Sequence, residues 1–122
     1  VVIGDYQYYK GYSLFLCKRH VSELHHLEPN FRQKFLMEMS LVAQAVMECF
    51  QPIKLNYECL GNKDAHLHWH LYPRYIDDPC PNKPIWYISK EIRCNQQTLA
   101  KPKELKEMTK RLRERIKALL KG

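Results

Sequence analysis

Several features that would direct the interpretation of this chain are missing from it. It contains no apolar run long enough to span a bilayer. The first residues, Val1-Val2-Ile3-Gly4-Asp5, lack the basic region followed by an apolar stretch that marks a secretory signal peptide. They also lack an initiator Met, so we expect that a few preceding residues have been removed or left out. A membrane partner is therefore not expected.

The chain also lacks paired cysteines. Its five cysteines, Cys17, Cys49, Cys59, Cys80 and Cys94, are odd in number and include no CxxC pair. This pattern argues against a disulfide framework and against a structural zinc knot. It suits free thiols in a reducing compartment, so we expect a cytoplasmic protein. We also expect no metal and no cofactor.

What the chain does contain fits one folded domain over residues 1–122, with 45% hydrophobic residues and eight tyrosines. The net charge of +7 is uneven, because the segment from Lys101 onward has nine basic and three acidic residues. Such a field favours anionic partners, including nucleic acid. The favoured interpretation is a solvated helix face, because no aromatic residue is interleaved for base stacking.

The hydrophobic pattern predicts a mixed fold. Apolar spacing indicates a long helix over 31–50 and a second, C-terminal helix over 105–119. Strands are expected within 1–9, over 13–17, 54–60 and 66–72, and as a short edge strand over 86–88, with a hairpin turn over 61–64. The four prolines between 77 and 102 indicate an irregular segment. We therefore predict an α+β fold, with an antiparallel sheet of about five strands, one long central helix and a C-terminal helix.

The histidine-rich stretch His66-Leu67-His68-Trp69-His70-Leu71-Tyr72 is the most informative motif. A β-strand sends successive side chains to opposite faces, so this spacing predicts a row of three imidazoles. The alternating Leu67, Trp69 and Leu71 are then expected to face the core.

Three interpretations of this row are possible. A metal site would need a third ligand such as His20 and carboxylates around it, yet Asp64 is the only carboxylate nearby in sequence. Buried structural histidines would explain one imidazole better than three. The favoured interpretation is nucleophilic catalysis, in which the middle imidazole attacks and the flanking ones orient it, bind anionic oxygens or donate protons.

The motif, HφHφHφφ with φ apolar, resembles the signature of the histidine triad superfamily. The upstream segment Gly11–His20 resembles the strand that precedes the family's long helix. Lys54-Leu-Asn56-Tyr, Leu60-Gly61-Asn62 and Pro73-Arg74 resemble the flanks of the triad in small prokaryotic-type members. The resemblance covers about residues 1–76 and leaves the Pro-rich tail and basic helix of 77–122 uncovered.

The resemblance implies a nucleotidyl hydrolase or transferase acting at the α-phosphate of dinucleoside polyphosphates, nucleoside phosphoramidates or acyl adenylates. His68 would form a covalent nucleotidyl intermediate, while His66 and His70 would contact the phosphate and protonate the leaving group. A histidine at the third triad position, His70, rather than Gln favours the hydrolase branch of the family.

The implied substrate-binding residues are Asp5 at the ribose hydroxyls, Asn62 at the phosphates or ribose, and Asn56, His20 and Arg74 as further candidates. For Arg74, an ion pair with Asp77 or Asp78 is an equal alternative. The resemblance also implies a homodimer.

Two departures from the family pattern keep a second hypothesis open. Tyr12 stands where the family often has a His, and a tyrosine carries no positive charge at neutral pH. The CxxC zinc motif of some members is absent, so no structural metal is expected. Tyr12 and the basic C-terminal segment motivate an alternative, a nucleotide-binding or interaction protein on the same fold with weak or lost catalysis. A third possibility is action on adenylated nucleic-acid ends gripped by the basic helix.

Overall fold

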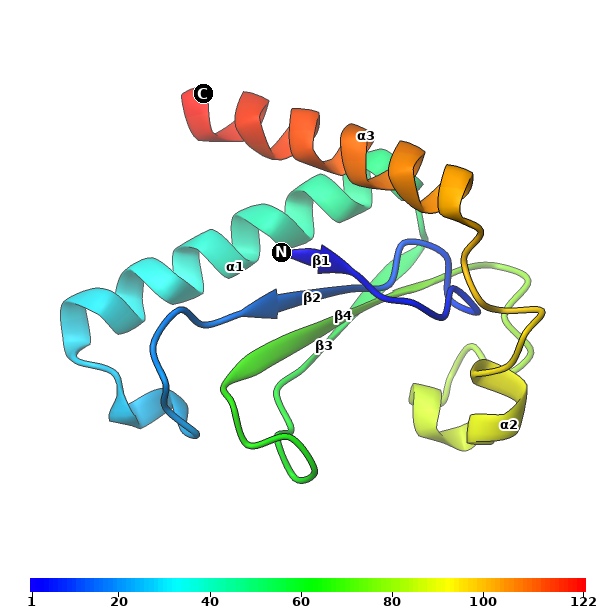
Figure 1. Ribbon diagram of the computed structural model, residues 1–122, viewed down its shortest axis with the longest axis horizontal. Helices are drawn as coiled ribbons and strands as arrows, with labels where there is room; N and C mark the ends of the chain where they lie inside the picture. Colours follow the sequence, from blue (N-terminus) through cyan, green and yellow to red (C-terminus); the bar gives the residue numbers. More distant parts are fainter.

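The computed structural model describes residues 1–122 and consists of one antiparallel sheet with two long helices (Figure 1). The strands are β1 (Val2–Ile3), β2 (Ser13–Leu16), β3 (Lys54–Glu58) and β4 (His68–Arg74), in the spatial order β1-β2-β4-β3. The long helices are α1 (Pro29–Phe50) and α3 (Pro102–Lys121). Short helical turns are η1 (Leu24–His26), η2 (Ile85–Tyr87) and α2 (Lys90–Arg93). The α+β class and both predicted long helices are confirmed.

Helix α1 packs against one face of the sheet. Pro29 lies in its first turn, where a missing N–H costs nothing. The helix ends at Gln51, whose left-handed backbone (φ 52°) directs its N–H to the Met47 carbonyl, and Pro52 prevents continuation. Its buried stripe repeats every three or four residues and consists of Phe35, Met39, Val42, Ala43, Ala45 and Val46.

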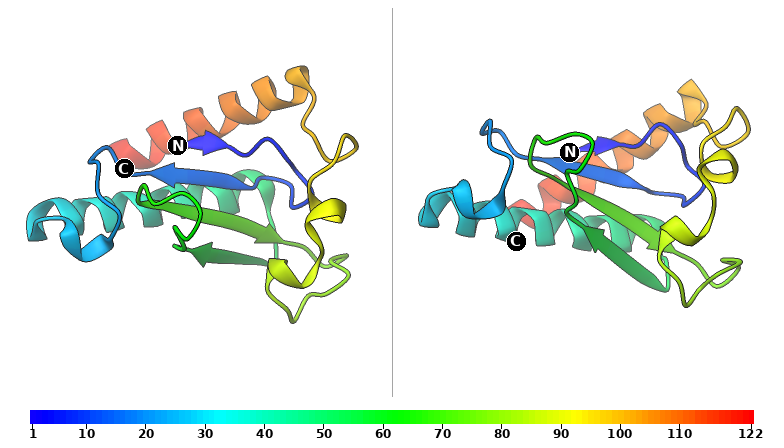
Figure 2. Two further views of the ribbon diagram at one scale, coloured as in Figure 1. Left: turned by 60° about the horizontal axis from the view of Figure 1, so that its bottom comes forward. Right: turned by 90° about the horizontal axis from the view of Figure 1, so that it is seen from below.

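The sheet sorts its side chains onto two faces. β4 pairs antiparallel with β2 and β3, placing Trp69 opposite Phe15 and His70 opposite Leu14. Leu71 and Phe15 are buried on the side covered by α1 and α3. Neither long helix covers the other face, which Figure 2 shows with both helices behind the sheet. Alternation along β4 therefore directs His68 and His70 to the uncovered face.

Helix α3 packs beside α1 and against β1, and it buries Met108 and Leu112. Arg115 of α3 forms an ion pair with Glu48 of α1. Most of the other basic side chains of α3 are exposed. None of the helices combines the length and the apolar character needed to cross a bilayer.

Two details of the predicted sheet are wrong. The sheet has four strands rather than about five, because residues 85–87 form the turn η2 instead of an edge strand. The fully buried Ile85 packs against Tyr9 and Tyr72, and this packing outweighs the strand propensity of the aromatic residues beside it. The triad strand also begins at His68 rather than His66, because the backbone N–H of Leu67 bonds to the Val21 carbonyl, outside the β2–β4 ladder.

Candidate active site

The three histidines converge at the start of β4. His68 faces Leu16 of β2, and His70 lies between Leu14 of β2 and Glu58 of β3. His68 is 7% exposed, so its ring is shielded from bulk water although it lies on the uncovered face. His66 precedes the strand, and its ring lies edge-on to that of His20, with 5.4 Å between the ring centroids.

Backbone carbonyls fix the tautomers of His66 and His68. His68 donates its Nδ1–H to the His66 carbonyl oxygen at 2.5 Å, and His66 donates its Nε2–H to the Cys17 carbonyl oxygen at 2.6 Å. A carbonyl only accepts hydrogen bonds, so each of these ring nitrogens carries the proton. In neutral His68 the lone pair is therefore on Nε2, the nitrogen that faces His70.

His70 completes a short chain of hydrogen bonds. Its Nε2 lies 3.1 Å from Nε2 of His68, and its Nδ1 lies 2.8 Å from the Tyr12 hydroxyl. Because His68 Nε2 holds a lone pair, His70 donates from Nε2 and accepts the Tyr12 O–H at Nδ1. Burial, and secondly the proximity of His68, lowers the pKa of His70. The His70 ring is thus neutral near pH 7 in the resting site.

Tyr12 and Tyr72 stack beside His70. Their rings are parallel within 1°, with centroids 4.2 Å apart. Burial raises the pKa of Tyr12, which the neighbouring Tyr72 hydroxyl partly offsets, and burial together with Tyr12 raises the pKa of Tyr72 further. Both hydroxyls therefore stay protonated at neutral pH.

The side chain of Gln7 bridges the loop between β1 and β2. Gln7 donates to the carbonyls of Gly4 (2.8 Å) and Tyr12 (3.1 Å) and accepts from the Gly11 N–H (2.7 Å). This loop carries both Tyr12 and Asp5, so Gln7 fixes their positions relative to β2.

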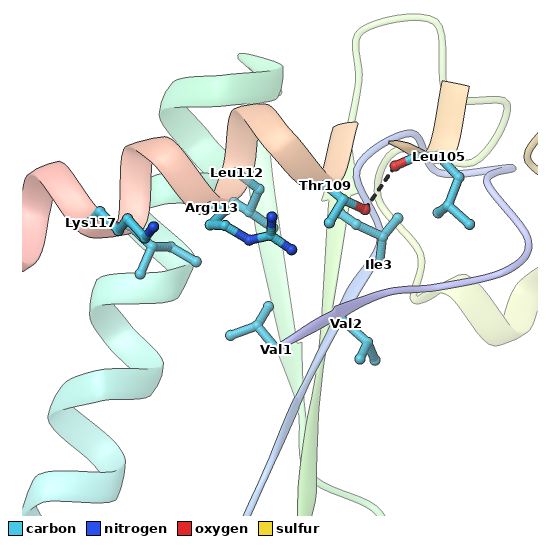
Figure 3. A pocket seen from close by; sticks show the side chains of 9 residues that line it. Val1, Val2, Ile3, Leu105, Thr109, Leu112, Arg113 and Lys117 are labelled. Atoms are coloured by element: carbon cyan, nitrogen blue, oxygen red, sulfur yellow. Dashed lines mark hydrogen bonds between the residues drawn. The ribbon is translucent and has the colours of Figure 1, made fainter. Parts of the chain in front are cut away.

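Cavities flank the histidines on two sides. One of about 270 Å³ adjoins Tyr12 and Leu14 and is also lined by Asp5, several tyrosines and Arg93. Another of about 230 Å³ reaches His68 and is lined by residues of the β3–β4 loop. A larger cavity of about 570 Å³ lies away from the histidines, between β1 and α3 (Figure 3). Its lining is mainly aliphatic, with Thr109, Arg113 and Lys117 as the polar residues and no histidine or carboxylate beside them, so its size does not make it the catalytic site.

The predicted substrate-binding residues have different environments. Asp5 lines the cavity beside Tyr12, and Asn62 is exposed in the β3–β4 loop next to Gly61, which lines the cavity at His68. His20 is exposed beside His66.

Arg74 and Asn56 instead bind each other and the chain. The buried Arg74 donates to Asp78 (2.6 Å), to Asn56 (2.8 Å) and to the carbonyls of Lys83 (2.7 Å) and Cys80 (2.8 Å). Burial raises the pKa of Asp78, but the Arg74 hydrogen bond and the Cys80 N–H outweigh it and leave that pKa below its ordinary value. Four of the five guanidinium donors are therefore used within the protein. These contacts indicate that Arg74 connects the segment after β4 to the sheet. The ion pair with Asp78 agrees with the alternative expected from the sequence.

Some residues of this region were not singled out from the sequence. Tyr72 continues the alternation of the triad by one step, so strand periodicity could have placed it on the same face. Glu58 lies opposite His70, and burial raises the pKa of its carboxyl although a hydrogen bond from Trp86 lowers it. Arg93, which lines the tyrosine-rich cavity, comes from the irregular segment after β4, where no local pattern marks it.

No three His, Cys, Asp or Glu side chains are grouped so that they could share a metal ion.

Comparisons with known proteins place this geometry in a family context. The sequence model of one protein family, the HIT domain, matches residues 7–77 of this chain. The curated protein named Protein hit, from Bacillus subtilis, is 28% identical over 71 residues, which cover 54% of this chain and 49% of that protein. The chain thus spans about half the length of this curated relative.

Solved structures resemble the fold over more of the chain. A histidine triad protein from Bradyrhizobium japonicum superposes with a TM-score of 0.80 at 23% identity, covering 93% of this chain and 81% of the other. A hypothetical histidine triad nucleotide-binding protein from Sulfolobus tokodaii has a TM-score of 0.72 at 19% identity, covering 96% and 76%. The segment after residue 77 therefore belongs to a fold shared with these structures, although it lies beyond the domain match.

Proposed function

The chain belongs to the histidine triad (HIT) domain family, and from that premise we propose that it is a nucleotidyl hydrolase. It would cleave at the α-phosphate of dinucleoside polyphosphates, nucleoside phosphoramidates or acyl adenylates, through a covalent intermediate on His68. The observation that carries this proposal is the Nε2 lone pair of the shielded His68, held there by the 2.5 Å bond from Nδ1 to the His66 carbonyl.

In the first step, His68 Nε2 attacks the α-phosphorus. The new P–N bond forms as the bond from phosphorus to the leaving group breaks, and the leaving group takes a proton from His70 Nε2. The bound phosphate brings negative charge beside His70 and offsets the burial that disfavours its imidazolium form, so His70 enters the step protonated. The His66 carbonyl stabilises the positive charge on the nucleotidyl-imidazole.

In the second step, water replaces His68. Its oxygen bonds to phosphorus, its proton passes to His70 Nε2, and the electron pair of the breaking P–N bond returns to His68 Nε2. A phosphorus–imidazole bond is labile enough for turnover at neutral pH. Positioned proton transfer of this kind contributes roughly 10²- to 10⁴-fold to a rate.

The cavities suggest how a nucleotide would lie. With the phosphate at His68 and His70, the nucleoside would occupy the tyrosine-lined cavity, where the Asp5 carboxylate can accept hydrogen bonds from ribose hydroxyls. The leaving group would extend toward the cavity lined by the β3–β4 loop, next to Asn62. His20 would lie near the leaving group, because its ring is edge-on to the ring of His66.

The proposal extends to a homodimer in the cytoplasm, built from a single domain, that needs no metal or other cofactor. Sedimentation equilibrium of the purified protein would measure its oligomeric state, and activity after exhaustive chelation would test the absence of a metal requirement.

The test is intact-protein mass spectrometry within seconds of mixing with a diadenosine polyphosphate or an adenosine phosphoramidate, without acid quench. We expect an adduct of one adenylyl group and release of AMP. His68→Ala should lose both while keeping nucleotide affinity. His25→Ala, which removes an exposed histidine of η1, is the matched control and should behave like the parent.

Turnover by His68→Ala at the parental rate would refute the mechanism. No adduct together with no AMP over hours, with nucleotide binding retained, would instead establish the alternative of a nucleotide-binding protein without catalysis.

A further inference from the structure

The hydrogen-bond chain from His68 through His70 ends on the hydroxyl of Tyr12. Tyr12 lies just before β2, and its hydroxyl is 2.8 Å from Nδ1 of His70. No backbone carbonyl contacts His70 as one contacts His66 and His68. Of the triad, His70 alone is held by two side chains: the His68 lone pair at Nε2 and the Tyr12 hydroxyl at Nδ1 together define its tautomer.

We infer that Tyr12 is a positioning residue that keeps His70 correctly protonated through both steps of the reaction proposed above, on which this inference rests. A hydroxyl both donates and accepts, whereas a carbonyl only accepts and an ammonium only donates. Tyr12 can therefore serve either protonation state of Nδ1 by rotating one O–H bond.

In the resting site, Tyr12 donates to Nδ1, so the single proton of neutral His70 lies on Nε2, toward His68. When His70 becomes an imidazolium, Nδ1–H donates to the tyrosine oxygen and Nε2–H still faces the reacting phosphate. After the leaving group has taken the Nε2 proton, Nδ1–H remains bonded to Tyr12 and the Nε2 lone pair is free. That lone pair then accepts the proton of the attacking water, which restores the imidazolium.

The surroundings hold Tyr12 in this position. Its ring stacks on Tyr72, and its backbone carbonyl accepts from Gln7 and from the Gly4 N–H at 2.9 Å. Gly4 makes room for the ring, because a Cβ at that position would lie 2.3 Å from a Tyr12 ring carbon. Burial keeps the hydroxyl protonated, so the donor is present at neutral pH.

The first experiment is NMR of isotope-labelled histidine, which distinguishes the two imidazole tautomers whether or not the protein turns over substrate. We expect neutral His70 to carry its proton on Nε2 in the parent. In Tyr12→Phe we expect a mixture of both tautomers. A proton on Nδ1 in the parent, or an unchanged tautomer in Tyr12→Phe, would overturn the inference.

The second experiment compares leaving groups. With an adenosine phosphoramidate, whose amine must be protonated, we expect Tyr12→Phe to lower kcat about tenfold to a hundredfold, part of the effect of positioned proton transfer. With the p-nitrophenyl ester of AMP, whose leaving group needs no proton, adduct formation should stay within about threefold of the parent. Equal losses for both substrates would mean that Tyr12 acts only through packing.

Three further variants sharpen this result. Tyr12→His restores a ring that donates and accepts, and should recover most of the amine-dependent rate. Gly4→Ala keeps the hydroxyl but displaces the Tyr12 ring, and should reproduce the loss. Tyr87→Phe removes the hydroxyl of an exposed tyrosine in η2, outside the loop that carries Tyr12, and should leave both rates unchanged. A parent that forms no adduct would refute the proposed hydrolase, and the NMR result would still decide the role of Tyr12.

Discussion

Replacing Arg74 by Met distinguishes a structural from a substrate-binding role for that residue. The Arg74 and Asp78 side chains are 4% and 2% exposed, and the guanidinium makes four hydrogen bonds. Met fills a similar volume but leaves the Asp78 carboxylate buried, with the Cys80 N–H as its remaining bond, at 2.8 Å. Removing one partner of a buried ion pair costs about 3–5 kcal/mol.

That loss is a large part of the roughly 5–15 kcal/mol by which domains are stable. In urea, a loss of about 4 kcal/mol at a slope of about 2 kcal/mol per molar lowers the unfolding midpoint by roughly 2 M. The parental pair also loses its effect as pH falls through the lowered pKa of Asp78, because protonation removes the charge that Arg74 binds. The difference in stability between parent and variant should therefore shrink in acid.

The control is the double variant Arg74→Met/Asp78→Leu. It removes the uncompensated charge and should recover part of the loss. At a temperature where Arg74→Met is folded, we expect its KM for the nucleotide to change little. A variant within about 1 kcal/mol of the parent in stability, but with a KM raised about tenfold, would show that Arg74 contacts the substrate and that the structural interpretation is wrong.

Three other predictions concern the fold and the triad. Leu71→Ala, at a fully buried position of β4, should lower the free energy of unfolding by about 2–5 kcal/mol in urea titrations; a smaller loss would contradict the packing seen between sheet and α1. Gly11→Ala should destabilise by at least about 1 kcal/mol, because φ is +92° and the new Cβ would lie 2.6 Å from the Phe50 ring; unchanged thermal unfolding would contradict that geometry. The lowered pKa of His70 means that the unfolded chain binds its proton first, so parental stability should fall as pH drops below about 6.5, and His70→Asn should flatten that dependence. A parallel pH dependence of the two proteins would show that His70 is not desolvated.

The sequence by itself determined the local elements and the chemical groups at their faces. Apolar spacing located α1, because a stripe repeating every 3.6 residues must be buried somewhere. The alternation of His and large apolar residues placed His68 and His70 on one face of a strand, since strand geometry fixes that relation without reference to the rest of the chain. The same signals failed at Trp86, where burial of the neighbouring Ile85 favoured a helical turn over a strand.

Only the tertiary structure decided which partners each group has. The tautomer of His68 follows from its own backbone two residues earlier. The tautomer of His66 depends on Cys17, and that of His70 depends on His68 together with Tyr12. Arg74 has the same charge in the sequence whether it binds phosphate or Asp78, and only the fold shows its hydrogen bonds to Asp78 and to two backbone carbonyls. Hydrogen bonds between distant segments depend on strand register and loop packing, and these are properties of the whole fold.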